Sequence, residues 1–206
     1  MTMRRTLAVV AVLAALLVAR HVLRRPHVAN PHPSSAVVVC FGDSLTAGTG
    51  AAPGQSYPDH LARLVGRDVV NAGVPGDTSA GALERLQRDV LDRHPGYVCI
   101  TLGGNDLKNG VEAGEAFANL ERIVSRIHQR GALAVVGGID IPLYGRGYPD
   151  GYRELQRSTG CVLVDNVYQG IFGHRELMSD PIHPNGRGYA VMAEHFHDAI
   201  EPFLEH

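Results

Sequence analysis

The residues of this chain best suited to chemistry are a serine, a histidine and an aspartate: Ser44, His183 and Asp180. A serine hydroxyl becomes an effective nucleophile when a neighbouring base removes its proton, and histidine titrates in the right range to be that base. His183 stands three residues after Asp180, in a turn bounded by Pro181 and Pro184. This spacing allows the carboxylate to accept from one ring nitrogen while the other nitrogen faces the serine. The three residues therefore predict attack by an activated hydroxyl.

Gly76 and Asn105 are candidates for stabilising the negative charge that such an attack creates on a carbonyl oxygen. One well-placed N–H donor contributes roughly 3–4 kcal/mol to this stabilisation. Gly76 offers an unobstructed backbone N–H, and Asn105 follows two glycines after an apolar run. Structural roles stay open for each residue alone, because Gly and Asn are common in turns and Ser44 is a favoured helix N-cap. For His183 the alternative is a turn that starts the last helix.

Five short apolar runs rich in β-branched residues are typical of strands buried on both faces. Amphipathic stretches with helical spacing lie between the runs and after the last one. The alternation predicts a parallel sheet with right-handed crossovers and helices on both faces. The expected strands are 36–41, 68–71, 97–102, 133–136 and 161–164, and the clearest helical faces fall within 83–90, 117–127 and 189–203.

The position of the polar segments relative to these strands is the strongest indication of a site. Residues 42–46, 71–79 and 103–106 each follow a predicted strand, and residues 180–184 precede the last helix. Ligands of parallel α/β sheets bind outside the carboxyl ends of the strands. We therefore expect these segments to meet at one edge of the sheet.

The composition excludes several other classes of protein. The 206 residues suit one domain, and 45% hydrophobic residues are enough to build a core. The formal charge of −2 argues against nucleic-acid binding driven by a basic surface. Cys40, Cys99 and Cys161 are too few for a disulfide scaffold and are expected to be inert core thiols. The glycine patterns of nucleotide-binding loops are absent from the sequence.

The first 25 residues form a separate unit. An apolar run over 7–19 follows Arg4 and Arg5, and arginines return at 20, 24 and 25. The run is shorter than the roughly 20 residues of a full membrane span, and a small-x-small cleavage site is missing. We expect residues 1–25 to be a signal peptide or an uncleaved signal-anchor helix, with a helix of the domain as the alternative. A Pro-rich linker over 26–35 and a catalytic domain over 36–206 would follow, and the protein would be membrane-anchored or exported to the periplasm.

Taken together, four segments resemble the blocks of the SGNH (GDSL) hydrolase superfamily, especially its bacterial thioesterase I/lysophospholipase L1 and arylesterase group. They are 41–48 (FGDSLTAG), 71–79 (NAGVPGDTS), 102–106 (LGGND) and 180–185 (DPIHPN), in the order of the family. The resemblance implies a flavodoxin-like three-layer α/β/α sandwich with a five-stranded parallel sheet. It implies Ser44 as nucleophile, His183 as base and Asp180 as orienting group. The Ser44 N–H, the Gly76 N–H and the Asn105 side chain would form the oxyanion hole, without a metal or organic cofactor.

The expected function is that of a serine esterase acting on small-molecule esters, thioesters or lysophospholipids. Two alternatives stay open: a carbohydrate deacetylase of the same superfamily, and a non-catalytic α/β binding module. Residues 141–150 follow the fourth predicted strand, and within them Tyr144 and Tyr148 are candidates for binding substrate or for anchoring a surface loop. We expect a monomer that does not bind nucleic acid and that associates with membranes only through its N-terminal segment.

Overall fold

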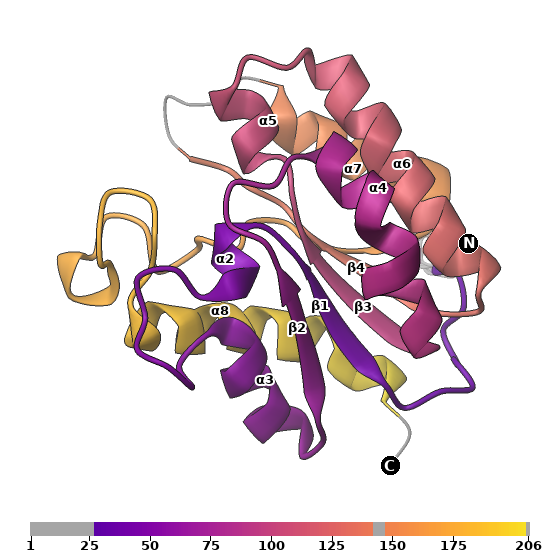
Figure 1. Cartoon of the computed structure of the whole chain (residues 1–206), viewed down its shortest axis with the longest axis horizontal. Coiled ribbons are helices and arrows are strands. Elements are labelled where there is room, and N and C mark those ends of the chain that lie inside the picture. Colours follow the sequence, from indigo (N-terminus) through magenta and orange to yellow (C-terminus); the bar gives the residue numbers. More distant parts are fainter. Residues whose placement is uncertain (1–26, 142–146, 205–206) are drawn as a thin grey trace, which may run out of the picture.

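A computed structural model of the chain describes residues 27–141 and 147–204. Within them, five parallel strands form one sheet in the order β2-β1-β3-β4-β5 (Figure 1). Their bounds are within two residues of the expected ones, so the predicted sheet is confirmed. The strands are β1 (Val38–Gly42), β2 (Val69–Gly73), β3 (Tyr97–Thr101), β4 (Leu133–Gly137) and β5 (Val162–Val164).

Helices cover both faces of this sheet, which confirms the three-layer α/β/α fold (Figure 1). The helices α3 (Tyr57–Val65) and α8 (Gly186–Ile200) pack together on one face. The other face carries α4 (Ser79–Asp89), α6 (Ala113–Gln129) and α7 (Tyr148–Thr159), with α6 packed between the other two. The remaining helices are short: α2 (Ser44–Ala47), α5 (Gly104–Lys108), η1 (Leu91–Arg93), η2 (Arg175–Leu177) and η3 (Glu201–Phe203).

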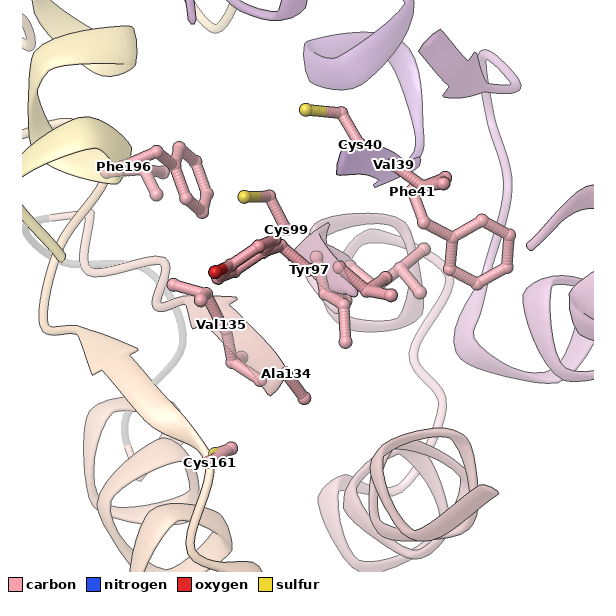
Figure 2. Packing of buried hydrophobic residues seen from close by; sticks show 14 of the residues in the cluster. Val39, Cys40, Phe41, Tyr97, Cys99, Ala134, Val135, Cys161 and Phe196 are labelled. Carbon is pink, nitrogen blue, oxygen red and sulfur yellow. The ribbon is translucent and has the colours of Figure 1, made fainter. Parts of the chain in front are cut away.

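The three central strands explain why the sheet is stable. Every residue of β1, β3 and β4 is buried, as expected for strands covered on both sides. Figure 2 shows Cys40 and Cys99 pointing toward the side of the sheet that carries Phe196, whereas Phe41 points the other way. Cys40 and Cys99 are register partners on β1 and β3, and both are buried free thiols, as is Cys161. The expectation that the cysteines belong to the core is confirmed.

Residues 27–35, which belong to the predicted linker, make specific contacts with the domain. The amide of Asn30 donates to the carbonyl oxygens of His128 and Ala132, at 2.9 and 3.0 Å. The N–H of Ala29 donates to Gly160 O at 2.9 Å, and Pro33 is buried. These hydrogen bonds hold the segment against the domain. The predicted N-terminal hydrophobic helix lies outside the described residues. Among the helices of residues 27–141 and 147–204, none is long and apolar enough to cross a membrane.

Candidate active site

The candidate nucleophile sits at a sharp turn where β1 ends. At Gly42 a side chain would collide with the backbone carbonyl of Thr101, so the strand can approach β3 closely only with glycine there. The carboxylate of Asp43 then caps α2 by accepting the N–H of Leu45 at 3.0 Å. Ser44 is the first residue of this short helix and lines a cavity at the sheet edge. The cap that the sequence suggested for Ser44 is thus supplied by its neighbour, and the serine side chain stays available.

Ser44, His183 and Asp180 are joined by two hydrogen bonds. Nε2 of His183 lies 3.0 Å from Oγ of Ser44, and Nδ1 of His183 lies 2.7 Å from Oδ2 of Asp180. The other carboxylate oxygen of Asp180 accepts the backbone N–H groups of Ile182 and His183 at 2.9 and 2.8 Å. The turn therefore fixes the carboxylate before it contacts the ring. The histidine side chain is 16% exposed and that of the aspartate 44%, so the pair lies at the mouth of the site.

Hydrogen bonds keep Asp180 ionised. Desolvation raises its pKa, but donation from the His183 ring and from the backbone N–H groups of Ile182 and His183 outweighs it and lowers the pKa to about 2. An ionised Asp180 holds a proton on Nδ1 of His183. Nε2 is then left as the acceptor that faces Ser44.

Two further hydrogen bonds hold the segment that carries His183. The hydroxyl of Tyr168 donates to Ile182 O at 2.6 Å, and the N–H of Ser179 donates to His183 O at 2.9 Å. Immediately after it, the side chain of Asn185 accepts the N–H groups of Arg187 and Gly188 and so caps α8. The turn-and-cap alternative considered for this motif is therefore present together with the contact to Ser44.

The structure brings Asn105 against the nucleophile segment. Its side-chain amide donates to Asp77 O at 2.9 Å and to Oδ2 of Asp43 at 3.2 Å. Gly76 has φ +81° at the third position of a turn closed by donation from the Asp77 N–H to Val74 O at 3.1 Å. Such a φ after a proline is typical of a type II turn, which favours glycine. Gly76 is exposed, and the next residue, Asp77, provides the carbonyl oxygen that accepts from the Asn105 amide.

Asp43 is a residue of the site to which sequence reasoning gave no role. Its side chain is 3% exposed and lines the same cavity as Ser44 and His183. Burial raises its pKa to about 6, against the opposing effect of the hydrogen bond from the Leu45 N–H. Asp43 thus directly precedes the candidate nucleophile in the chain and accepts from the Asn105 amide.

The cavity beside Ser44 has a volume of about 460 Å³ and is mostly apolar. Tyr148 lies elsewhere: it is 4% exposed and packs against Phe117 and Tyr152, with ring centroids 5.3 and 6.4 Å away. Tyr144 lies outside the described residues. The cavity is lined by Asp43, Ser44, Leu45, Gly104, Asn105, Leu107, Lys108, Ile139, Ile141, Tyr168, Phe172, Pro181, Ile182 and His183.

A buried polar network that the sequence did not reveal holds α4 against α5. Asp106 is 1% exposed and accepts from both the N–H and the hydroxyl of Ser79, the latter at 2.6 Å. Asn119 of α6 donates to the same hydroxyl at 3.2 Å. Because Asp106 follows Asn105 directly, this network fixes the start of α5 and the position of the amide. In the described parts of the chain, no group of three or more His, Cys, Asp or Glu side chains is arranged to hold a metal ion.

The chain is similar to a family of known proteins. Residues 40–191 match the GDSL-like Lipase/Acylhydrolase family. Arylesterase of Vibrio mimicus is 31% identical over 173 residues, which are 78% of this chain and 86% of the relative. Esterase TesA of Pseudomonas aeruginosa is 29% identical over 81% of this chain and 89% of the relative. Thioesterase 1/protease 1/lysophospholipase L1 of Escherichia coli is 27% identical over 82% and 85%.

Solved structures of such proteins have the same fold. The crystal structure of TesA superimposes with a TM-score of 0.76 at 29% identity, covering 82% of this chain and 99% of that one. AlinE4, an SGNH-hydrolase family esterase, superimposes with a TM-score of 0.65 at 32% identity, covering 84% and 98%. Fold, site and relatives define the class of protein as an esterase-type hydrolase that acts on ester bonds. The chain belongs to the GDSL-like lipase/acylhydrolase family, and the resemblance noted from its motifs is confirmed.

Proposed function

We propose that this hydrolase cleaves carboxylic esters or thioesters with apolar acyl groups through an acyl-enzyme on Ser44. The observation that carries the proposal is the pair of hydrogen bonds that runs from Ser44 through His183 to Asp180, at 3.0 and 2.7 Å. Neither a turn nor a cap explains why a serine hydroxyl and an imidazole 139 positions apart meet at the mouth of an apolar cavity.

In the first half of the reaction, Nε2 of His183 takes the proton of the Ser44 hydroxyl as Oγ attacks the carbonyl carbon. The imidazolium that forms is stabilised by the carboxylate of Asp180. His183 then gives the proton to the departing alkoxide or thiolate, and the bond to the leaving group breaks. In the second half, His183 deprotonates a water molecule, which attacks the carbonyl carbon of the acyl-enzyme. The bond between that carbon and Oγ then breaks, His183 returns the proton to Ser44, and the acid is released.

The oxyanion of each tetrahedral intermediate is held by the N–H groups of Ser44 and Gly76 and by the amide of Asn105. Within the part of the chain that the structure describes, these two backbone N–H groups have no other hydrogen-bond acceptor. The Asn105 amide keeps its 2.9 Å bond to Asp77 O, which orients it. The oxyanion replaces Oδ2 of Asp43 as the acceptor of the second N–H of this amide, because that hydrogen bond is the longer of the two at 3.2 Å.

The lining of the cavity supports an apolar acyl group rather than an acetylated sugar. Leu45, Leu107, Ile139 and Ile141 offer no hydrogen bonds to sugar hydroxyls, and burying unpaired hydroxyls against them is costly. A volume of about 460 Å³ accommodates an acyl chain of several carbons. Relatives named esterase, arylesterase and thioesterase are consistent with both oxygen and sulfur leaving groups.

A substrate panel tests this function. Purified protein is assayed with p-nitrophenyl esters of increasing acyl length, with an acyl thioester and with acetylated xylo-oligosaccharides, each beside Ser44→Ala. We expect turnover of the esters and the thioester, a preference for chains longer than acetyl, and no turnover by the variant. Preferential release of acetate from the sugars would support the deacetylase instead. Equal turnover by Ser44→Ala would overturn the proposal.

We also propose that residues 1–25 export the protein or anchor it to a membrane, and that residues 36–206 form the catalytic domain. The support is the apolar run at 7–19 between arginine clusters. Fractionation of cells expressing the full-length chain, with and without detergent, tests this. Recovery of the full-length chain in the membrane fraction, or of a shortened chain outside the cytosol, is expected. Quantitative recovery of the full-length chain in the cytosol would contradict it.

A further inference from the structure

The guanidinium of Arg85 contacts the ends of two strands, although the residue belongs to α4. Nε donates to Oδ2 of Asp77 at 2.7 Å, and Nη2 donates to Gly42 O at 2.9 Å. Nη1 donates to Ala72 O at 2.9 Å and to Oδ2 of Asp89 at 3.1 Å. The group also lies 4.3 Å above the ring centroid of Phe41.

Burial makes these contacts stronger than an ordinary surface ion pair. The side chains of Arg85 and Asp77 are 10% and 9% exposed. Charges removed from water are tolerated when they are paired and hydrogen-bonded, and Arg85 makes four hydrogen bonds, two of them to carboxylates. Arg88 gives the contrast: it pairs with the same Asp89, yet its side chain is 78% exposed and it touches neither strand end.

Two contacts of Arg85, those to Gly42 and Asp77, lie next to segments that carry proposed oxyanion donors. Gly42 O belongs to the residue directly before the Asp43-Ser44 turn and also accepts the N–H of Val74 at 2.9 Å. Asp77 follows Gly76, and its carbonyl oxygen is the acceptor that orients Asn105. One rigid guanidinium thus connects two segments. The first is the backbone that carries the Ser44 N–H, and the second is the turn that carries the Gly76 N–H and orients the Asn105 amide.

We propose that Arg85 is a positioning residue that sets the spacing of the three oxyanion donors. This inference rests on the function proposed above. Arg85 acts through Gly42 and Asp77 and does not touch the substrate. A lysine at this position supplies one compact charge and cannot form the same fork of bonds to carboxylate and carbonyl groups. Removing the fork breaks the side-chain link between Gly42 and Asp77, so the turn that carries Gly76 can move relative to the segment that carries Ser44.

The expected consequence is a loss of turnover without a matching loss of substrate binding. Misplacing catalytic groups by about 1 Å costs on the order of 100-fold in rate. Because an oxyanion exists only in the transition state and the intermediates, the defect should lower kcat and leave KM nearly unchanged. A residue that merely stabilised the fold would lower the number of working sites, and each remaining site would turn over normally.

The test compares Arg85→Ala and Arg85→Lys with Arg88→Ala as the matched control on the same helix. Sites are counted by reaction to completion with a fluorophosphonate, and kcat and KM for a p-nitrophenyl ester are expressed per titrated site. We expect a kcat per site about 10- to 100-fold lower for both Arg85 variants, with KM within about threefold, and wild-type values for Arg88→Ala. Should the alanine variant not fold, the lysine variant, which keeps a cation beside Asp77 and Asp89, carries the comparison alone.

Chemical rescue separates positioning from stability. Guanidinium chloride, far below denaturing concentrations and matched in ionic strength with sodium chloride, should restore part of the kcat of Arg85→Ala. It should not increase the kcat of wild type or of Arg88→Ala. Wild-type kcat per site in the Arg85 variants would overturn the inference and leave the proposed function intact. A wild-type protein that neither takes the fluorophosphonate nor hydrolyses the ester would overturn the proposed function, and the role of Arg85 with it.

Discussion

Nε2 of His183 lies 3.0 Å from Oγ of Ser44, although 139 positions of sequence separate the two residues. The sheet brings them together: Ser44 begins the helix after β1, and His183 precedes α8, which packs on the same sheet. A separation of 3.0 Å suits proton transfer from the hydroxyl to the ring. The chemistry proposed for this protein depends on that contact.

Replacing the proposed nucleophile or the proposed base should abolish ester hydrolysis. Ser44→Ala removes the attacking oxygen, and His183→Ala removes the group that accepts its proton. We expect each to lower kcat by at least about 10⁴-fold, and the double variant to be no worse than the stronger single one, because the two residues act as a unit. Steady-state kinetics on a p-nitrophenyl ester check this. Additive losses in the double variant would show that the residues act independently.

Asp180→Asn should be less damaging than His183→Ala. The side chain still accepts backbone N–H groups, but it no longer stabilises an imidazolium. We expect its kcat to exceed that of His183→Ala by roughly 100-fold, yet to stay far below wild type. The comparison needs both variants at one pH under saturating substrate. A kcat equal to wild type would mean that Asp180 has no orienting role.

Asn105→Ala should lose turnover with little change in KM. Its amide is aimed by Asp77 O at 2.9 Å and is proposed to meet the oxyanion, which the ground-state ester lacks. Removal of one such donor costs about 10²- to 10³-fold in kcat. The control is Asn109→Ala, at the exposed C-terminal end of the same helix, which should behave as wild type. A rise in KM at unchanged kcat would instead place Asn105 in ground-state binding.

The buried carboxyl of Asp43 should make stability depend on pH. Burial raises its pKa from 3.8 in the unfolded chain to about 6 in the fold. The folded state therefore binds this proton more tightly, so the contribution is favourable below about pH 4 and is lost as pH rises through about 6. A shift of that size corresponds to about 3 kcal/mol.

Thermal unfolding of wild type and Asp43→Asn between pH 4 and pH 7 tests this prediction. The Tm of the variant relative to wild type should rise across that interval, because only wild type has a carboxyl at position 43 to ionise. Asp150→Asn, with a side chain 85% exposed, is the control, and its Tm relative to wild type should not change with pH. A relative Tm that falls with increasing pH would show that ionised Asp43 stabilises the fold.

Narrowing the cavity should change the preferred acyl length. Leu107 lines it, so Leu107→Trp fills space that a longer chain needs. We expect the kcat/KM ratio of octanoyl to butyryl ester to fall about tenfold or more, within the range that a few methylenes provide. Leu64→Trp, at a site 44% exposed on α3, is the control and should not alter the ratio. An unchanged ratio for Leu107→Trp would place the acyl chain elsewhere.

The sheet was predictable because its signals are local. Continuous apolar runs such as 97–102 occur only where both faces are covered, and their ends place the polar segments at one edge. The motif around His183 was equally predictable, because a single turn provides both the Asp180 carboxylate and the His183 ring. In both the strands and this turn, the residues that form the sequence signal lie within a few positions of one another.

Arg85 and Asp106 could not be predicted in the same way. An arginine on an amphipathic helix is usually exposed, and the only signal for burial is its place three residues after Ala82 on the inward face. The partners of Asp106 lie 27 positions away at Ser79, and no spacing rule connects them. Tyr148 illustrates the opposite problem: it begins α7 and packs into the core, although its Gly- and Pro-rich surroundings suggested a loop.

Direct detection of a covalent intermediate tests the central claim most sharply. The protein is mixed with an activated acyl ester, quenched in acid during turnover, digested and analysed by peptide mass spectrometry. The proposed mechanism predicts a mass increase equal to the acyl group on Ser44, lost in Ser44→Ala. Acyl transfer to another residue, or turnover with no covalent adduct when deacylation is rate-limiting, would contradict it.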